Sequence, residues 1–289
     1  MRKVTAAAVQ MSVPDTREQS VEKAVGLAEK AAKMGAEIVL LPELFETNYF
    51  CQERRYESYK LAYSTEEDLA VKRFTKLTKE LSLVMPISFF ERDGNVLYNS
   101  VAMLDCGRLL GVYRKTHIPD DHFYQEKFYF TPGNTGFKVW DTSRGKIGAG
   151  ICWDQWFPEA ARCMALMGAE LLLYPTAIGS EPILDCDSSA HWQRCMQGHA
   201  AANLVPVIAA NRVGVEKVLP DEDNSFQKSE LKFYGHSFMT DETGGIKESA
   251  EREETILVSE YDLDEINDFR LSWGVFRDRR PEMYKKLVE

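Results

Sequence analysis

Short apolar segments that resemble strands alternate along this chain with segments of helical periodicity. Residues 4–10 and 37–41 are typical of buried strands, and apolar residues recur between them at helical spacing over 21–32. The same alternation returns over 147–210, and hairpins lie between and after the two stretches. This pattern favours a mixed α/β fold built in layers.

The boundaries of the other elements follow from the same two periods and from turn and capping residues. Ser64 and Glu67 form a capping-box pair ahead of a helix, and Pro158 suits the first turn of a helix that Gly168 would end. Another helix is expected over 192–203. Further strands are expected over 84–90, 100–104, 109–113, 137–141, 147–151, 171–174 and 205–210, followed by a hairpin that turns at 241–245.

The composition is that of one globular domain. Of the 289 residues, 44% are hydrophobic and 28% charged, and no linker divides the chain, so a single domain over 1–289 is expected. The 35 basic and 45 acidic residues give a net charge of -10, which disfavours nucleic acid and membrane partners. No apolar run could cross a bilayer. Six scattered cysteines give no disulfide scaffold, and we expect a cytoplasmic protein with reduced thiols.

Three chemically reactive residues each lie just beyond the end of an expected strand. They are Glu43, Lys115 and Cys152. In α/β sheets, sites form outside the ends of the strands, so a carboxylate, an ammonium and a thiol in equivalent positions can converge there.

Cys152 has the strongest local evidence for a reactive role among the three candidates. Gly148 and Gly150 precede it and permit either close backbone packing or a positive φ, and the chain then turns toward the helix entered at Pro158. A thiol on such an elbow is exposed at the mouth of the sheet. A nearby helix N-terminus and Lys115 would both favour the thiolate.

Each of these residues also has an ordinary structural explanation. Taken alone, Glu43 would be a helix-entry or surface acid, Lys115 a solvated side chain and Cys152 a buried small hydrophobe. A Cys–His pair is a further option, with His117 as the best candidate. The cysteines and histidines lack the spacing of a metal site, and Gly-x-Gly at 148–150 lacks the lysine of a phosphate-binding loop, so no metal or cofactor is expected.

These segments resemble the nitrilase superfamily of carbon–nitrogen hydrolases. The matching motifs are Tyr-Arg-Lys-Thr-His-Ile-Pro at 113–119, Tyr-Gln-Glu-Lys-Phe-Tyr-Phe-Thr-Pro-Gly at 124–133 and Gly-Ile-Cys-Trp-Asp-Gln-Trp-Phe-Pro-Glu at 150–159. The resemblance implies a four-layer α-β-β-α sandwich with two mixed β-sheets. It also implies a catalytic triad with a second glutamate beside it, formed by Glu43, Lys115, Cys152 and Glu126.

Within the superfamily the chain most resembles the N-carbamoylputrescine amidases, through residues 154–159, 174–182, 191–199 and 273–281. The resemblance implies hydrolysis of N-carbamoylputrescine to putrescine, ammonia and carbon dioxide, through a carbamoyl thioester on Cys152. This is a reaction of polyamine biosynthesis, and it needs no cofactor.

The resemblance also implies a site for a small cationic ureido substrate. Glu181 is the candidate partner of its amine, and Asp185 and Asp187 just beyond would add to a negative field. Aromatic walls for the butyl chain are expected from Tyr49, Tyr124 and Trp153.

Two alternatives remain open at this point. The substrate could be another N-carbamoyl amine, an N-carbamoyl amino acid, as in β-ureidopropionases, or an ω-amide, with Arg194 as the partner of a substrate carboxylate. The chain could also be a catalytically silent ligand-binding scaffold. The resemblance further implies a homo-oligomer built from dimers, in which a C-terminal tail over about 270–289 reaches across an interface.

Overall fold

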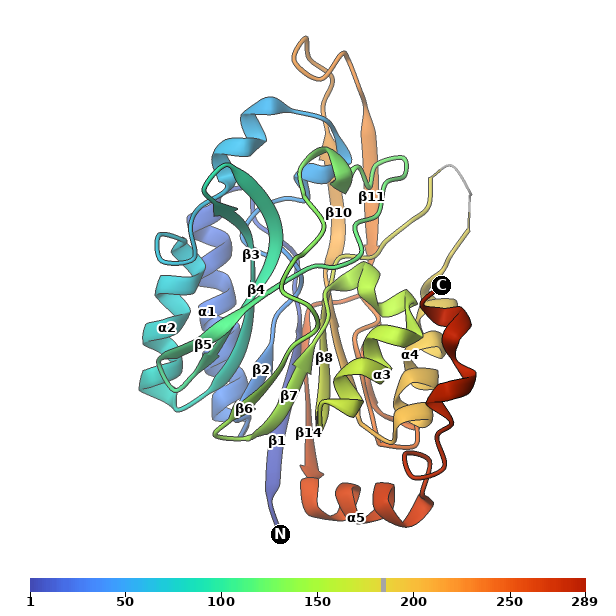
Figure 1. Cartoon of the computed structure of the whole chain (residues 1–289). Coiled ribbons are helices and arrows are strands. Elements are labelled where there is room, and N and C mark those ends of the chain that lie inside the picture. Colours follow the sequence, from blue (N-terminus) through green and yellow to red (C-terminus); the bar gives the residue numbers. More distant parts are fainter. Residues whose placement is uncertain (183–185) are drawn as a thin grey trace.

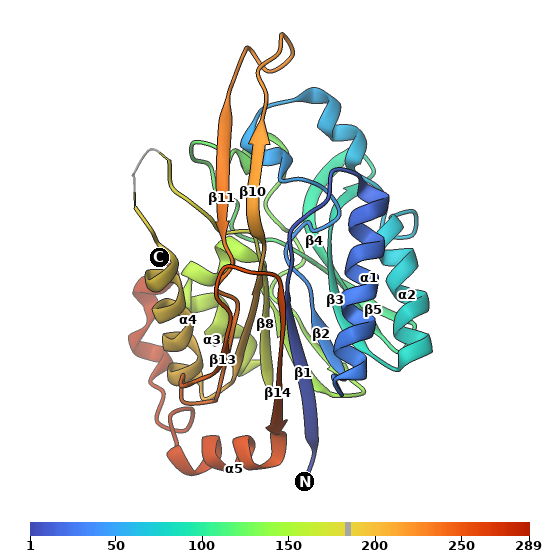
Figure 2. The same cartoon turned by 180° about the vertical axis from the view of Figure 1, so that it is seen from behind.

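The computed structural model describes residues 1–182 and 186–289. Two six-stranded sheets pack face to face, and helices cover their outer faces (Figures 1 and 2). The first sheet has the order β14-β1-β2-β3-β4-β5 and the second β13-β12-β9-β8-β7-β6. Helices α1 (Arg17–Lys33) and α2 (Leu69–Leu81) cover the first sheet, and α3 (Pro158–Leu166) and α4 (Ser189–Asn203) cover the second. The expected mixed α/β fold with two sheets is confirmed.

Both sheets mix parallel and antiparallel strands. In the first sheet, β1, β2 and β3 run parallel, and β14 pairs antiparallel with β1. In the second, β7, β8 and β9 run parallel. The strands of the first sheet are β1 (Lys3–Gln10), β2 (Ile38–Leu40), β3 (Val84–Asp93), β4 (Val96–Asp105), β5 (Arg108–Arg114) and β14 (Thr255–Asp262). Those of the second are β6 (Val139–Thr142), β7 (Gly145–Ala149), β8 (Leu171–Thr176), β9 (Val207–Asn211), β12 (Phe238–Thr240) and β13 (Ile246–Ser249).

Apolar side chains from the inner faces of both sheets form one core between them. Leu40 and Met103 of the first sheet lie in the same buried cluster as Ile147 and Leu173 of the second. This cluster holds the two sheets together, so it also fixes the positions of the loops at their ends.

The capping-box prediction for α2 is wrong in its position. Ser64 does contact Glu67, at 3.1 Å, but in a turn that precedes the helix. The helix begins at Leu69, and Asp68 is its N-cap, with a side-chain oxygen that accepts from the backbone N–H of Val71 at 3.0 Å. The sequence offered two capping residues, and the later one is used.

Four elements near the C-terminus were not expected from the sequence. They are the two-stranded hairpin of β10 (Val213–Val218) and β11 (Ser229–Tyr234), the long strand β14, and α5 (Leu263–Trp273). In β11 buried and exposed residues alternate, with Glu230 and Lys232 on the exposed face, as in a half-buried strand.

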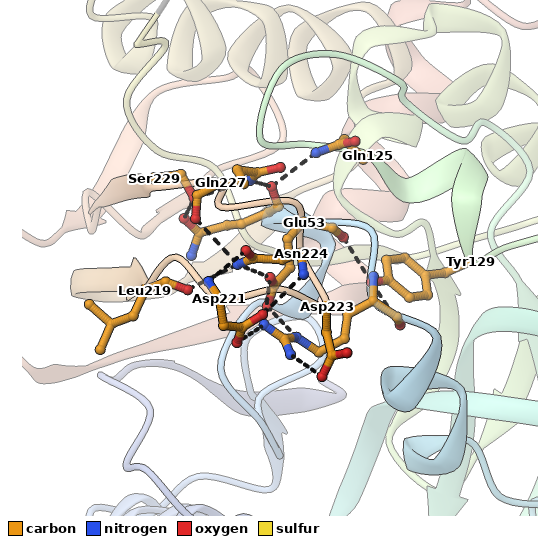
Figure 3. A network of polar contacts seen from close by, with 11 residues as sticks. Glu53, Gln125, Tyr129, Leu219, Asp221, Asp223, Asn224, Gln227 and Ser229 are labelled. Carbon is orange, nitrogen blue, oxygen red and sulfur yellow. Dashed lines mark hydrogen bonds and ion pairs between the residues drawn. The ribbon is translucent and has the colours of Figure 1, made fainter.

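The tip of the β10–β11 hairpin is tied to a loop of the first half of the chain. Asp221 lies 2.8 Å and Asp223 3.8 Å from Arg55 in ion pairs. Asn224 is buried and donates to Glu53 Oε2 at 2.8 Å, and Figure 3 shows this network. The Arg55 hydrogen bond lowers the pKa of Asp221, so this acidic residue is part of the contact and not merely solvated.

The C-terminal segment after α5 folds back beside the second sheet's helices (Figure 1). The guanidinium of Arg162 in α3 lies 5.1 Å from the ring centre of Phe276. Several large apolar side chains of this region are exposed: Leu271, Trp273, Met283, Leu287 and Val288. Among the described residues, no helix has the length and hydrophobicity that a bilayer crossing requires.

Candidate active site

The two charged residues of the expected triad meet at the end of the first sheet. Glu43 follows β2 and Lys115 follows β5, and Lys115 Nζ lies 2.8 Å from Glu43 Oε1. Glu126 completes the group, with its Oε2 2.7 Å from the same ammonium. Cys152 comes from the second sheet, shortly after β7, and lines the same cavity as Glu126, and the charges of Glu43, Lys115 and Glu126 shift its pKa. The structure thus brings the four residues together.

Cys152 sits on a strained turn. Its φ is 39°, in the left-handed region that side-chain-bearing residues rarely adopt, and a 3₁₀ turn over Cys152–Trp156 begins there. The glycine before it serves close packing, because a Cβ on Gly150 would lie 2.7 Å from Cε1 of Tyr174. Of the two uses considered for the glycines, the structure therefore shows close approach at Gly150, and the positive φ belongs to the cysteine itself.

Burial raises the pKa of the Cys152 thiol well above its ordinary value, and the negative charge of Glu43 raises it further. Lys115 and a backbone hydrogen bond from Ala177 act in the opposite direction and are outweighed. The expectation that the surroundings favour a resting thiolate is therefore not met. A neutral thiol in this position needs a base to become a nucleophile.

Glu43 presents one oxygen for that purpose. Its Oε1 accepts from Lys115 Nζ at 2.8 Å and from Asn99 Nδ2 at 2.7 Å. Its Oε2 is buried and has no hydrogen-bond partner among the residues that the structure describes. The carboxylate is thus held by one oxygen, and the other can take a proton. Asn99 lies within β4 and in no motif, so sequence reasoning missed it.

Lys115 is an ammonium enclosed by two carboxyl groups. Burial alone would lower its pKa, but Glu126 and Glu43 outweigh this effect and the pKa is raised well above the ordinary value. Burial raises the pKa of Glu126 to about 7, against the lowering effect of Lys115. Tyr49 donates its hydroxyl hydrogen to Glu126 Oε1 at 2.7 Å.

Tyr49 is therefore not the substrate wall that the sequence suggested. It is 1% exposed, and it is absent from the described lining of the cavity that contains Cys152. Its ring packs against Tyr124 and Phe233 while its hydroxyl orients Glu126. The sequence gives the residue type but not the direction in which the ring points.

A fully buried arginine holds the backbone beside Glu43. Arg212 donates through Nε and Nη2 to the carbonyl of Glu43, each at 3.1 Å, and through Nη1 to that of Thr47 at 3.0 Å. It also pairs with Glu216 at 2.9 Å. Because Arg212 follows β9 of the second sheet, it ties the second sheet to the loop that carries Glu43. It has no motif of its own and was not predicted.

A cavity of about 390 Å³ opens onto Cys152, a size typical of small-molecule sites. Tyr124, Trp153, Glu126 and Glu181 line it, as expected from the sequence. Asp120 and Asp121 add two carboxylates that the sequence analysis did not single out. Among its described lining residues there is no lysine or arginine, and residues 183–185 are Ile, Leu and Asp.

Glu181 is half-buried in this cavity. Burial, and next the charge of Asp121, raise its pKa to about 7. The other predicted acids add less: Asp187 pairs with Arg252 at 3.2 Å instead, and Asp185 lies outside the described residues. The cavity thus carries a carboxyl group in a partly dehydrated setting.

His117 and Arg194, the residues on which two alternative interpretations depend, are not among the described residues that line the cavity. His117 Nδ1 lies 2.8 Å from Asp154 Oδ1, and the His117 ring stacks on Phe157 at 3.6 Å, so it supports the turn after Cys152. Arg194 is exposed on α4 and is not among the described residues of the cavity lining. A search of the described residues finds no group of three or more His, Cys, Asp or Glu that could hold a metal ion.

Comparisons with known proteins agree with this geometry. The profile of the family described as "Carbon-nitrogen hydrolase" matches residues 5–271. An N-carbamoylputrescine amidase of Oryza sativa is 52% identical over 99% of this chain and 95% of its own. A citrullinase of Francisella tularensis is 51% identical over 100% and 99%. A solved carbon–nitrogen hydrolase of Helicobacter pylori superposes with a TM-score of 0.90 at 39% identity, covering 99% of both chains. The chain belongs to the carbon–nitrogen hydrolase family.

Proposed function

We propose that this protein hydrolyses N-carbamoylputrescine to putrescine, ammonia and carbon dioxide, as a step of polyamine synthesis. The observation that carries the proposal is the charge of the cavity, in which Cys152 is accompanied by Glu181, Asp120 and Asp121 and by no lysine or arginine among the described lining residues. A ureido group with an ammonium at its far end matches both features. The relatives from Oryza and Arabidopsis, at 52% and 50% identity, carry this activity in their names.

The first half of the reaction would use the unpartnered oxygen of Glu43. Glu43 Oε2 removes the thiol proton as Cys152 Sγ attacks the ureido carbon. Lys115 and the backbone N–H of Trp153 stabilise the negative oxygen of the tetrahedral intermediate. Glu43 then gives its proton to the departing ammonia, and a carbamoyl thioester remains on Cys152.

The second half hydrolyses that thioester. Water attacks the carbamoyl carbon while Glu43 takes its proton, and the C–S bond breaks to restore the thiol. The carbamate that leaves decomposes to putrescine and carbon dioxide. Glu126, with Tyr49 and Lys115 as its hydrogen-bond partners, keeps the ammonium in place through both steps.

The alternative substrates fit this cavity less well. An N-carbamoyl amino acid with only a carboxylate at its far end would face Glu181 and the aspartates, and Arg194 lies outside the lining. An ω-amide would likewise bring a carboxylate into the same field. A silent scaffold would have no use for the enclosed Glu43, Lys115 and Cys152 group.

Ammonia release from N-carbamoylputrescine and from N-carbamoyl-β-alanine tests the proposal. We expect turnover of the first compound at least tenfold more efficient than that of the second, since only the first carries a cation for Glu181. Cys152→Ala and Glu43→Gln should both abolish turnover. A preference for the anionic compound would contradict the proposed substrate.

We further propose that the protein works in the cytoplasm as a homo-oligomer built from dimers. All six cysteines are free, consistent with a reducing compartment. The segment from about 270 to 289 exposes several large apolar side chains, among them Trp273 and Leu287, which suit an interface. Deleting residues 274–289 should lower the number of protomers per particle, measured by light scattering. An unchanged number would remove the tail from the interface.

A further inference from the structure

One buried carboxylate connects the loop that carries Lys115 to the turn that carries Cys152. Asp154 is fully buried and lies two residues after Cys152. Its backbone N–H donates to the carbonyl of Ile151 at 3.0 Å, and its Oδ2 accepts from the N–H of Ile151 at 2.9 Å. Asp154 therefore closes the turn onto the residue directly before the cysteine. A positive φ such as that of Cys152 persists only where the surrounding contacts enforce it.

The same carboxylate also contacts residues on both sides of Lys115. Its Oδ2 accepts from the hydroxyl of Tyr113 at 2.7 Å, and its Oδ1 accepts from the backbone N–H of His117 at 3.0 Å. His117 Nδ1 also lies 2.8 Å from Oδ1, and since a carboxylate can only accept, this nitrogen carries the hydrogen. The Tyr113 hydroxyl accepts in turn from the N–H of Thr116 at 3.2 Å, directly after Lys115. Residues on either side of the lysine are thus fastened to one side chain of the cysteine's turn.

These contacts cross from one sheet to the other. Tyr113 belongs to β5 of the first sheet, and Asp154 follows β7 of the second. His117 adds a second contact across the same junction, because its ring stacks on Phe157 with the ring centres 3.6 Å apart, at the end of the cysteine's turn. Asp154 is therefore the polar centre of the contact that fixes how far the lysine stands from this turn.

We propose that Asp154 is a positioning residue for the two donors to the tetrahedral intermediate, the ammonium of Lys115 and the backbone N–H of Trp153. The inference rests on the proposed function, which assigns the negative oxygen to these two groups. Each of the two segments that Asp154 connects supplies one of them. Asp154 is not among the described lining residues of the cavity, so it acts through its neighbours. Because such donors work only when they are aimed at the developing charge, a looser contact should slow the chemistry more than it weakens substrate binding.

The key variant is Tyr113→Phe, which removes one hydroxyl and leaves the hydrogen bonds within the turn intact. We expect kcat for ammonia release from N-carbamoylputrescine to fall about tenfold to a hundredfold, with little change in KM. Alkylation of Cys152 by iodoacetamide, mapped by mass spectrometry, is the second measurement. This reaction displaces iodide from a saturated carbon and develops no negative oxygen, so it needs the thiol and its base but not the two donors. Its rate should stay close to that of the wild type.

Asp154→Asn is the stronger change, since the amide keeps only one of the two acceptor oxygens. It should lower kcat further than Tyr113→Phe does, and combining the two substitutions should add little, because both break the same contact. Tyr261→Phe is the matched control. It removes a hydroxyl from another buried tyrosine, on β14 at the opposite edge of the same sheet, and should leave kcat and KM unchanged.

The outcomes separate the inference from the proposed function. If the wild-type protein releases no ammonia from N-carbamoylputrescine, both fall. If the wild type turns over this compound and Tyr113→Phe keeps the full kcat, only the inference falls. Parallel losses of turnover and of Cys152 alkylation in Tyr113→Phe would give the contact a merely structural role and would also overturn the inference. Tyr113→Phe decides alone if Asp154→Asn fails to fold.

Discussion

The carboxylate proposed as the base, Glu43, is oriented by the groups that donate hydrogen bonds to it. Glu43 has two donors on one oxygen, Lys115 and Asn99, and none among the described residues on the other. The asymmetry fixes the rotation of the carboxylate and points its second oxygen away from the pair. Preorganisation of this kind is a large part of what separates a catalytic carboxylate from an ordinary buried one.

The Asn99→Ala variant tests whether the hydrogen bond from Asn99 to Glu43 contributes to catalysis. Without the amide, Glu43 loses one of two restraints, and we expect kcat to fall about tenfold to a hundredfold with a smaller change in KM. Because Asn99 acts through Glu43, the pH profile of kcat should shift as well. Asn224→Ala, which removes a buried amide from the hairpin tip, is the control and should leave the profile unmoved. An unshifted profile in Asn99→Ala would give Asn99 a purely structural role.

Glu181 should make substrate binding depend on pH. Its pKa is raised to about 7, chiefly by burial, so below that pH the group is neutral and loses its attraction for an ammonium. We expect KM for N-carbamoylputrescine to rise about tenfold for each pH unit below 7 and to level off above it. In Glu181→Gln, KM should be high and independent of pH in this range. A wild-type KM that stays flat from pH 5.5 to 8 would contradict this role.

The residues that carry reactive groups could be predicted from the sequence, but those that position them could not. Glu43, Lys115 and Cys152 stand after strands and within recognisable motifs. Asn99 and Arg212 are single polar residues in or beside buried strands, where no local pattern tells a partner of the site from any other polar residue. Such contacts depend on the packing of distant segments.

At the scale of elements, the β10–β11 hairpin is a long projection anchored at its tip. Asn224 donates to Glu53 Oε2 and to the carbonyls of Leu219 and Gln227, and its Oδ1 accepts from the N–H of Asp221 (Figure 3). One buried amide therefore both shapes the turn and fastens it to another loop. The sequence shows the charges of this loop but not the residues with which they pair.

Asn224→Ala should loosen the tip without unfolding the sheets. Leaving several polar groups unpaired costs about 1–3 kcal/mol. We expect faster amide hydrogen exchange over 219–227 and over the facing loop at 53–55, measured by mass spectrometry. The strands β1 and β8 should retain their protection. Uniformly faster exchange throughout the chain would show that the tip is needed for global stability instead.

At the scale of the whole molecule, the active site exists only where two sheets meet. Glu43 and Lys115 stand on the first sheet and Cys152 on the second. Their separation is fixed by the apolar core between the sheets, and Arg212 adds a polar tie across the same junction. The layered architecture was predictable because strand and helix periods alternate. The junction between the two sheets could not be predicted, because the hydrophobic periods do not show which loops face one another.

Replacing two leucines of similar burial separates the effect of the core between the sheets on catalysis from that of the rest of the core. Leu40 lies between the sheets and Leu77 lies between α2 and the first sheet, and both are essentially buried. Replacing either with Ala should lower the free energy of unfolding by about 2–5 kcal/mol. Only Leu40→Ala should also lower kcat at temperatures where the variant stays folded. Equal kcat losses in both variants, measured beside thermal melting curves, would contradict the distinction.

The neutral Cys152 thiol also bears on how the enzyme survives oxidants. Peroxides react with thiolates and spare protonated thiols, and burial keeps this sulfur protonated until Glu43 takes its hydrogen. Cys163 and Cys186 are exposed, so peroxide has direct access to their sulfurs. Peroxide should therefore react with these two sulfurs before it reacts with Cys152, the proposed nucleophile.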